Sequence, residues 1–191
     1  MTVAAARPAS EPGAGVPAVR LRPARASDVP ALHALATQVF LDTYATSGVS
    51  SALAHEAMAQ FACAAFEASL ADPLRRLLVA ERDRHLLGYA EVVAGASQAL
   101  VPDLASAELN RLYVQRPFLR GGLGTRLLRG AERLAAGCGA TTLWLTVWVG
   151  NVGARDFYAA RGYADLGATG YSFGGRTFEN RVCARRLGGP A

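Results

Sequence analysis

The sequence predicts one α/β (α+β) domain built on a mixed central sheet of about seven strands with four helices. Its apolar residues switch between the alternating pattern of strands and the three-to-four-residue spacing of helices. Of the 191 residues, 51% are hydrophobic, which is enough for one sizeable core. The segments follow the order β, α, α, β, β, β, α, β, α, β, β, so we expect a sheet that is antiparallel at first and parallel later.

The first half of the chain is expected to open with a strand, where Val19 and Leu21 alternate with arginines. Either Ser27 or Asp28 can cap the helix that follows. The expected elements are then a helix through Phe40, a linker over 41–49, a second helix from about 50 to 72 that Pro73 ends, a hairpin of strands 77–81 and 86–93 around the turn 82–84, and a loop over 94–107.

A turn with three glycines follows a predicted buried strand over 109–114. Gly121, Gly122 and Gly124 let the backbone turn tightly and leave its amides uncovered. Free amides and a helix dipole converge at such a turn, which favours a phosphate or pyrophosphate ligand. Taken alone, the glycines are equally consistent with simple packing of the helix. The helix has one apolar face, made of Leu123, Leu127, Ala131, Leu134 and Ala135.

A second motif comes after the strand predicted over 142–148. Asn151 is placed to cap a short helix over 153–160, and Gly162 suits the position just after that helix. The complete pattern is Asn-x-x-Ala-x-x-Phe-Tyr-x-x-x-Gly-Tyr, in which Tyr158 is the second aromatic residue.

The two motifs occur in the order and spacing of the GNAT superfamily of N-acetyltransferases, which this sequence resembles. The resemblance implies the GNAT fold, with strands splayed at an acetyl-CoA site, and Leu119 departs from the Gln or Arg usual at the start of the turn. That departure removes a side chain and leaves the amides in place. The cofactor contacts implied by the resemblance are Leu112, Tyr113, Val114, Arg120, Gly121, Gly122, Leu123, Gly124, Thr125, Asn151, Arg155 and Tyr158.

A closer resemblance extends over residues 19–187, to the bacterial spermine/spermidine N-acetyltransferases of the PaiA type. The segments that show this resemblance are Leu112-Tyr113-Val114, residues 143–148, Phe157-Tyr158 and residues 171–175. The resemblance implies a polyamine acceptor. An Asp that is usual in the last strand of that group is replaced around Asn180, which weakens the polyamine assignment but not acetyl transfer.

Acetyl transfer from a thioester to an amine requires a base, a donor to the carbonyl oxygen and an acid for the leaving sulfur. By the resemblance, Tyr158 is the general acid, and the Val114 amide stabilises the carbonyl oxygen if the strand is bulged there. Glu108 is the candidate base, acting directly or through water, with Glu91 as a weaker candidate. The structural alternatives are a half-buried Tyr158 that completes a helix face and a solvated Glu108 at a strand end.

Several acids of the predicted helices are candidates for attracting a cationic acceptor, and solvated surface explains them equally well. They are Asp42, Glu56 and Glu67, with Tyr44 beside them. His33, His55 and His85 have neither metal-ligand nor triad spacing, so we expect no metal cofactor.

The composition excludes some function classes. All 20 basic residues are Arg, so there is neither a Schiff-base lysine nor a phosphate-loop Gly-Lys-Ser/Thr. The net charge of +5 permits nucleic-acid binding, but the arginines are dispersed and no recognition motif accompanies them, so no nucleic-acid partner is expected. No run of residues is long and apolar enough to span a membrane, so no membrane partner is expected.

Three widely spaced cysteines, Cys63, Cys138 and Cys183, argue against a disulfide framework and favour the cytoplasm. Residues 1–18 are expected to form a flexible tail ahead of one domain over 19–187. The oligomeric state is left open, with a homodimer among the alternatives.

The leading hypothesis from the sequence is an acetyl-CoA-dependent N-acetyltransferase that acts by direct transfer in a ternary complex. Its acceptor is a small primary amine, with a polyamine as one candidate. The alternatives are a non-catalytic acetyl-CoA sensor, an acetyltransferase of peptide or protein N-termini, and a basic nucleic-acid-binding domain, which salt-sensitive binding would reveal.

Overall fold

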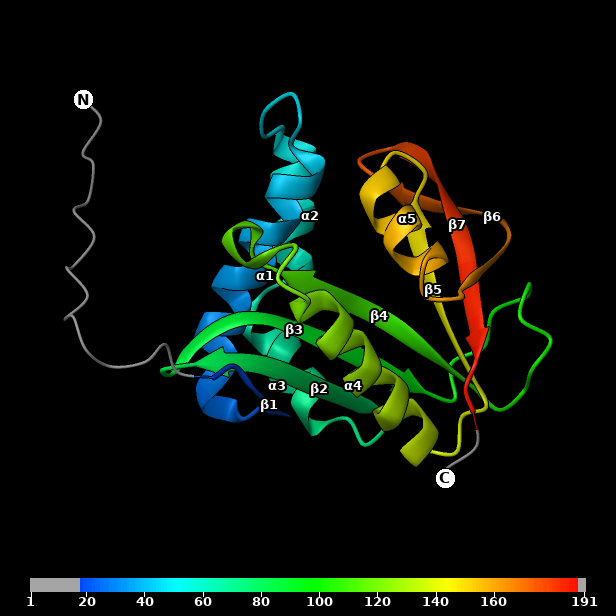
Figure 1. Ribbon diagram of the computed structural model, residues 1–191. Coiled ribbons are helices and arrows are strands. Elements are labelled where there is room, and N and C mark those ends of the chain that lie inside the picture. The colour runs from blue at the N-terminus through cyan, green and yellow to red at the C-terminus, as the bar shows by residue number, and fades with distance from the viewer. Residues whose placement is uncertain (1–17, 189–191) are drawn as a thin grey trace, which may run out of the picture.

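The computed structural model describes residues 18–188, which form one seven-stranded sheet flanked by helices (Figure 1). The strand order is β1-β2-β3-β4-β5-β7-β6, and every neighbouring pair is antiparallel except β4 and β5. The predicted fold class and mixed sheet are confirmed. Of the expected N-terminal tail, residues 1–17 lie outside the described residues. The strands are β1 Arg20–Pro23, β2 Arg75–Arg82, β3 His85–Ala94, β4 Ser106–Val114, β5 Thr142–Trp148, β6 Ala164–Phe173 and β7 Arg176–Arg186.

Helices cover both faces of the sheet and create two apolar cores (Figure 1). Strand β2 shows the division, because Leu77 and Val79 pack toward one face and Leu78 and Ala80 toward the other, as the period of two requires. The first core lies under α1 (Val29–Tyr44), α2 (Ser51–Gln60) and α3 (Cys63–Ala71). The second lies under α4 (Leu123–Gly137), with Tyr158 of α5 (Val152–Ala159) joining it.

The second predicted helix is in fact two, because the chain bends at Phe61 and Ala62. Ala62 is extended, with φ −53° and ψ 145°, and Phe61 is fully buried beside Phe40. His33 Nδ1 lies 2.6 Å from the carbonyl oxygen of Phe61, which satisfies a helix-end acceptor and confirms a structural role for that histidine. The bend turns Phe61 into the core, and hydrophobic spacing alone does not reveal it.

The first helix runs four residues beyond the predicted end at Phe40, to Tyr44. The rings of these two residues lie 4.8 Å apart, so the extra turn continues the aromatic face of the helix. Asp28 precedes the helix, but its carboxylate accepts from Arg22 at 2.7 Å and from the Arg25 amide instead of capping α1. The Arg22 bond lowers the pKa of Asp28 below its ordinary value.

The predicted hairpin is confirmed as β2 and β3, joined by Asp83 and Arg84. Both residues have positive φ, 50° and 63°, the conformation of tight hairpin turns that follow the natural twist of strands. The loop between β3 and β4 packs against the sheet. Its residue Ala96 accepts a bond of 3.1 Å from the indole of Trp144, and its Val101 is buried on β5 and β7.

Candidate active site

The central strands separate at one end of the sheet and leave a cleft between them. Strand β4 pairs with β5 only from Ser106 to Glu108, opposite Thr142 to Trp144, although both strands continue well beyond. A cleft of about 680 Å³ fills the gap, with its walls on β4, β5, α1, α5 and the β6–β7 hairpin. The splayed strands implied by the resemblance are therefore present.

Two main-chain amides of β4 face this gap. The Gln115 amide donates to Leu87 O at 3.0 Å, and Val114 lies opposite Gly88. Hydrogen-bonding direction alternates along an antiparallel pair, so Leu112 and Val114 direct their amides away from β3, toward the gap. Tyr113 instead directs its main chain to β3, which corrects the expectation that its main chain holds the cofactor.

A β-bulge does occur in β4, but at Asn110 and not at Val114. The register with β3 shifts between Glu91 and Val92, so Asn110 and Arg111 together stand opposite one stretch of β3. The extra residue turns both side chains to the α1–α3 face of the sheet, where each bonds Glu91. The expected bulge at Val114 is therefore wrong, although the Val114 amide faces the gap without it.

The glycine turn has the geometry of an anion site. Arg120 and Gly122 have positive φ, 62° and 78°, and α4 starts at Leu123 without any side-chain cap. The first amides of α4 therefore have no side-chain acceptor and point out of the helix N-terminus together with its dipole. A Cβ at Gly124 would lie 3.4 Å from the Phe157 ring, an ordinary packing distance, so Phe157 alone does not require glycine there.

Arg161 places a positive charge at this turn, and the sequence analysis missed it. Its Nη2 lies 2.7 Å from the hydroxyl of Thr125, and its guanidinium stacks 3.7 Å above the ring of Phe157. Arg126, in the first turn of α4, instead donates to Val19 O. Arg161 lies in the turn after α5, four residues beyond Phe157, and no sequence motif singled it out.

A second cavity of about 430 Å³ leads from the start of the turn to the main cleft. Arg116 and Leu119 line it beside Val114, and Trp148 and Asn151 line both cavities. Leu119 is exposed, so the missing Gln or Arg leaves an apolar wall there. The two cavities therefore adjoin at Trp148 and Asn151.

Asn151 caps α5, as predicted, and it also faces both cavities. Its Oδ1 accepts from the Ala154 amide at 3.1 Å, and within residues 18–188 its Nδ2 has no hydrogen-bond partner. That amide nitrogen is free to donate to a ligand. Arg155, in contrast, lines neither cavity and lies 3.5 Å from Val149 O, so nothing in its position supports the expected cofactor contact.

We expect Asn151→Ala to lower stability by about 1 kcal/mol through loss of the α5 cap and to weaken acetyl-CoA binding through loss of Nδ2. Thermal melts with and without acetyl-CoA measure both effects. Ser50→Ala is the matched control, because Ser50 caps α2 by accepting from the Leu53 amide at 3.2 Å. An equal loss of the acetyl-CoA shift in both variants would contradict a cofactor contact by Asn151.

Tyr158 lies at the inner wall of the cleft. It is buried, its ring contacts those of Phe157 and Tyr163 at 5.2 and 5.6 Å, and its hydroxyl has no hydrogen-bond partner among residues 18–188. Burial raises the pKa of Tyr158 above its ordinary value, so the phenol stays protonated at neutral pH. A protonated hydroxyl without an internal partner is in the state that a proton donor needs.

Glu108 lies where β4 and β5 part, and it lines the same cleft as Tyr158. Burial raises the pKa of Glu108, and Arg75 opposes this rise. A carboxylate with a raised pKa is a better proton acceptor near neutral pH than an ordinary one. The two candidate catalytic side chains therefore share one cavity.

Glu91 has a different role from the one first considered. Its side chain has no exposed area, and its two oxygens accept from Arg75 at 2.8 Å, Arg111 at 2.6 Å and Asn110 at 2.9 Å. These donors occupy both oxygens, and Glu91 lines neither cavity. It holds the bulged part of β4 in place.

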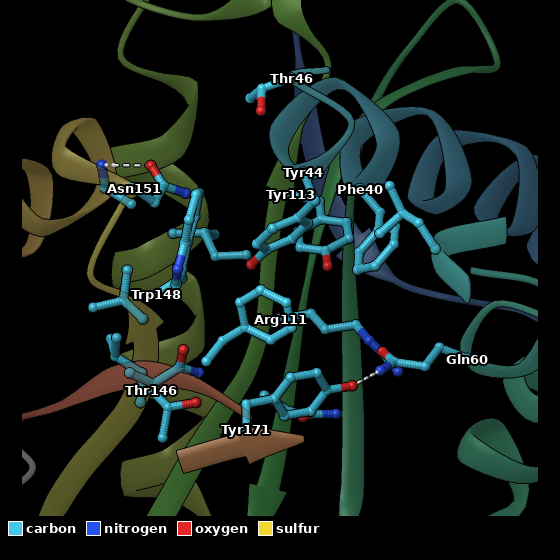
Figure 2. Close-up of a pocket in the computed structure, with 18 of the residues that line it drawn as sticks. Phe40, Tyr44, Thr46, Gln60, Arg111, Tyr113, Thr146, Trp148, Asn151 and Tyr171 are labelled. Carbon is cyan, nitrogen blue, oxygen red and sulfur yellow. Dashed lines mark hydrogen bonds between the residues drawn. The ribbon is translucent and has the colours of Figure 1, made fainter. Parts of the chain in front are cut away.

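Aromatic side chains stand along the walls of the main cleft (Figure 2). Tyr44 of α1 and Trp148 of β5 approach across it, with ring centroids 5.8 Å apart. Tyr171 of β6 bonds both Glu56 and Gln60 of α2, which ties the β6–β7 hairpin to that helix. The sequence analysis did not identify Trp148 or Tyr171 as site residues.

The acids expected near the acceptor divide into three groups. Asp42 lines the second cavity, Glu56 reaches the site through Tyr171, and Glu67 is exposed on α3 and lines neither cavity. Among residues 18–188, no cluster of three or more His, Cys, Asp or Glu side chains could hold a metal ion. None of the helices in that range is long and apolar enough to cross a membrane.

A family model and a curated relative both match this chain, and both are acetyltransferases. The Acetyltransferase (GNAT) family model matches residues 36–163. An uncharacterized N-acetyltransferase of Mycobacterium tuberculosis is 30% identical over 129 residues, which are 68% of this chain and 78% of that protein.

Two solved structures share the fold at low sequence identity. The PaiA N-acetyltransferase of Thermoplasma acidophilum, in complex with coenzyme A, has a TM-score of 0.71 at 19% identity and covers 88% of this chain and 99% of its own. YncA of Salmonella typhimurium, with its cofactor acetyl-CoA, has a TM-score of 0.66 at 19% identity, covering 91% and 96%.

Proposed function

Since the chain belongs to the Acetyltransferase (GNAT) family and is an acetyl-CoA-dependent N-acetyltransferase, we propose that it acetylates a small primary amine by direct transfer in a ternary complex. One observation carries the proposal. Glu108 and Tyr158 line the main cleft, and Val114, whose amide faces the gap between β4 and β5, lines the second cavity; these are the three groups that the reaction needs. Acetyl-CoA supplies the acetyl group as a thioester.

Cofactor binding is assigned to the backbone of β4 and to the glycine turn. The Leu112 and Val114 amides face the gap, and Asn151 offers Nδ2 from the opposite wall. The glycine turn and the uncapped start of α4, together residues 120–125, offer their amides to the pyrophosphate, with the charge of Arg161 beside them.

Each catalytic group has one task. Glu108 takes a proton from the ammonium form of the acceptor, directly or through water, and leaves a nucleophilic amine. The Val114 amide donates to the carbonyl oxygen as negative charge grows there. Tyr158 donates its proton to the sulfur when the carbon–sulfur bond breaks.

Direct transfer is supported by the positions of the cysteines. Cys63 and Cys138 are exposed, Cys183 is buried, and no cysteine of residues 18–188 lines the main cleft. Burial also raises the pKa of the Cys183 thiol, which disfavours the reactive thiolate. An acetylated cysteine is therefore not part of the proposed route.

The acceptor class is tested with purified full-length protein by following release of the CoA thiol. The panel contains spermidine and spermine, which the PaiA resemblance suggests, with amino acids, aminoglycosides and N-terminal peptides. We expect turnover with at least one small amine and a rise in melting temperature with acetyl-CoA. Binding of acetyl-CoA without turnover of any class would favour the sensor alternative. A cytoplasmic location and a homodimer are further proposals, and the chromatographic mass tests the dimer.

A further inference from the structure

The charged side chains that line the main cleft are mostly positive. Within residues 18–188, the charged side chains on the cleft wall are Arg111, Arg176 and Glu108. Glu91 is completely enclosed, so its charge does not face the cavity. A polycation would meet two guanidinium groups in this space.

Arg111 is held rigidly and has donors to spare. One of its nitrogens, Nη1, lies 2.6 Å from Glu91, and its guanidinium stacks 5.2 Å from the centre of the Phe61 ring. Within residues 18–188, its remaining N–H groups have no hydrogen-bond partner. A guanidinium fixed before binding loses little freedom when an anion arrives, and its planar fork matches a carboxylate.

Arg176 provides a second, more exposed positive charge on the rim. It lies in β7 directly after the hairpin turn and stacks 5.5 Å from the Phe178 ring. No acidic side chain of the described residues pairs with it. The two arginines come from different strands and line the same cavity.

Glu108 and Arg111 share one face of β4 because of the bulge. Without the extra residue at Asn110, positions 108 and 111 would face opposite sides of the sheet, since strand side chains alternate. The bulge therefore places a proton acceptor and an anion-binding cation in one cavity. Phe40, Tyr44 and Tyr171 supply apolar walls around them.

We propose that the acceptor is a small amine that also carries a carboxylate, with Arg111 as the main carboxylate-binding residue and Arg176 as a second one. The inference rests on the proposed acetyl transfer, in which Glu108 receives the amine. The carboxylate lies toward Arg111, and an apolar body packs on the aromatic wall. Amino acids with apolar side chains fit this description, and spermidine does not.

The test compares amines that differ only in the carboxylate. Calorimetric titration into the CoA-loaded, full-length protein uses L-phenylalanine against phenethylamine, L-leucine against isopentylamine, and spermidine. We expect the carboxylate-bearing member of each pair to bind at least tenfold more tightly than its partner and more tightly than spermidine. Equal or tighter binding of the decarboxylated amines or spermidine would overturn the proposal.

Two variants test the residues. Arg111→Gln is expected to abolish the tenfold preference for the carboxylate-bearing member of each pair. Because Arg111 also contacts Glu91, Arg176→Gln is measured in parallel, and this exposed change is expected to reduce the preference two- to fivefold without unfolding. If both variants fold and keep the full preference for the carboxylate, Arg111 and Arg176 do not bind it. If Arg111→Gln fails to fold and Arg176→Gln keeps the full preference, the proposal is also wrong.

Turnover of the same pairs separates this inference from the proposed function. Carboxylate-selective binding without acetylation would leave the inference standing and remove the proposed function. Acetylation of all these amines without selectivity would support the proposed function and overturn the inference of a carboxylate-bearing acceptor.

Discussion

Replacing Tyr158 by Phe is expected to lower the turnover number by roughly 10²- to 10⁴-fold, the usual contribution of a positioned acid or base. The ring is retained, and the lost hydroxyl has no hydrogen-bond partner within residues 18–188, so stability should change little. Acetyl-CoA should still raise the melting temperature. Initial rates of CoA release and thermal melts measure these quantities.

Tyr163→Phe is the matched control for this variant. Tyr163 is also buried against the same ring cluster, but its hydroxyl donates to Glu132 at 3.1 Å and it does not line the cleft. We expect this change to cost stability, about 1 kcal/mol, and to leave turnover nearly intact. Equal turnover losses in the two variants would show that Tyr158 acts through packing and not as an acid.

Replacing Glu108 by Gln is expected to reduce kcat/KM by roughly 10²- to 10⁴-fold at neutral pH and to remove the acidic limb of the pH–rate profile. Because the pKa of Glu108 is raised by burial, the parent enzyme should lose activity as the pH falls through a value above the ordinary pKa of about 4.3. Below that value the carboxyl is protonated and cannot accept a proton. Glu67→Gln, an exposed change on α3 away from both cavities, should retain the parent profile.

The melting temperature of Glu108→Gln shows whether its loss of activity comes from a missing catalytic group or from a less stable fold. A carboxyl whose folded pKa is raised stabilises the fold below its unfolded pKa and loses that contribution as the pH rises through the folded pKa. At pH 7 to 8 the variant should therefore melt at the same temperature as the parent or higher. A variant that melts lower and regains activity on cooling would contradict the catalytic role.

Much of the fold followed from local patterns in the sequence. The strand 142–148, the helix that starts at Leu123 and the hairpin turn at 82–84 each have a short-range signal, and each is confirmed. The break at Phe61 and Ala62 has no such signal, because it depends on how Phe61 packs against residues distant in the sequence.

The candidate site was predictable in its cofactor half and not in its acceptor half. The glycine turn and Asn151 act through backbone geometry that their residue types reveal. Arg111, Trp148 and Tyr171 meet only when β4, β5 and the β6–β7 hairpin are assembled around one cavity. The orientation of Arg111 depends on the bulge at Asn110, and a one-residue shift of that kind is invisible in a strand pattern.

The buried carboxylate of Glu91 shows the same limit. On the sequence it is one acid on a predicted strand, comparable with Glu108. Only the sheet register brings Arg75 and Arg111 to its two oxygens and turns it into a structural residue. Glu108 is two residues before that cluster and lies open to the cleft.

The central claim is direct transfer of the acetyl group within the gap between β4 and β5. Initial rates of CoA release, measured while acetyl-CoA and the best acceptor are varied together, test it most directly. The account predicts intersecting lines in the double-reciprocal plots, because both substrates must occupy the cleft before the acetyl group moves. Parallel lines, with an acetylated protein recovered after exposure to acetyl-CoA alone, would contradict it.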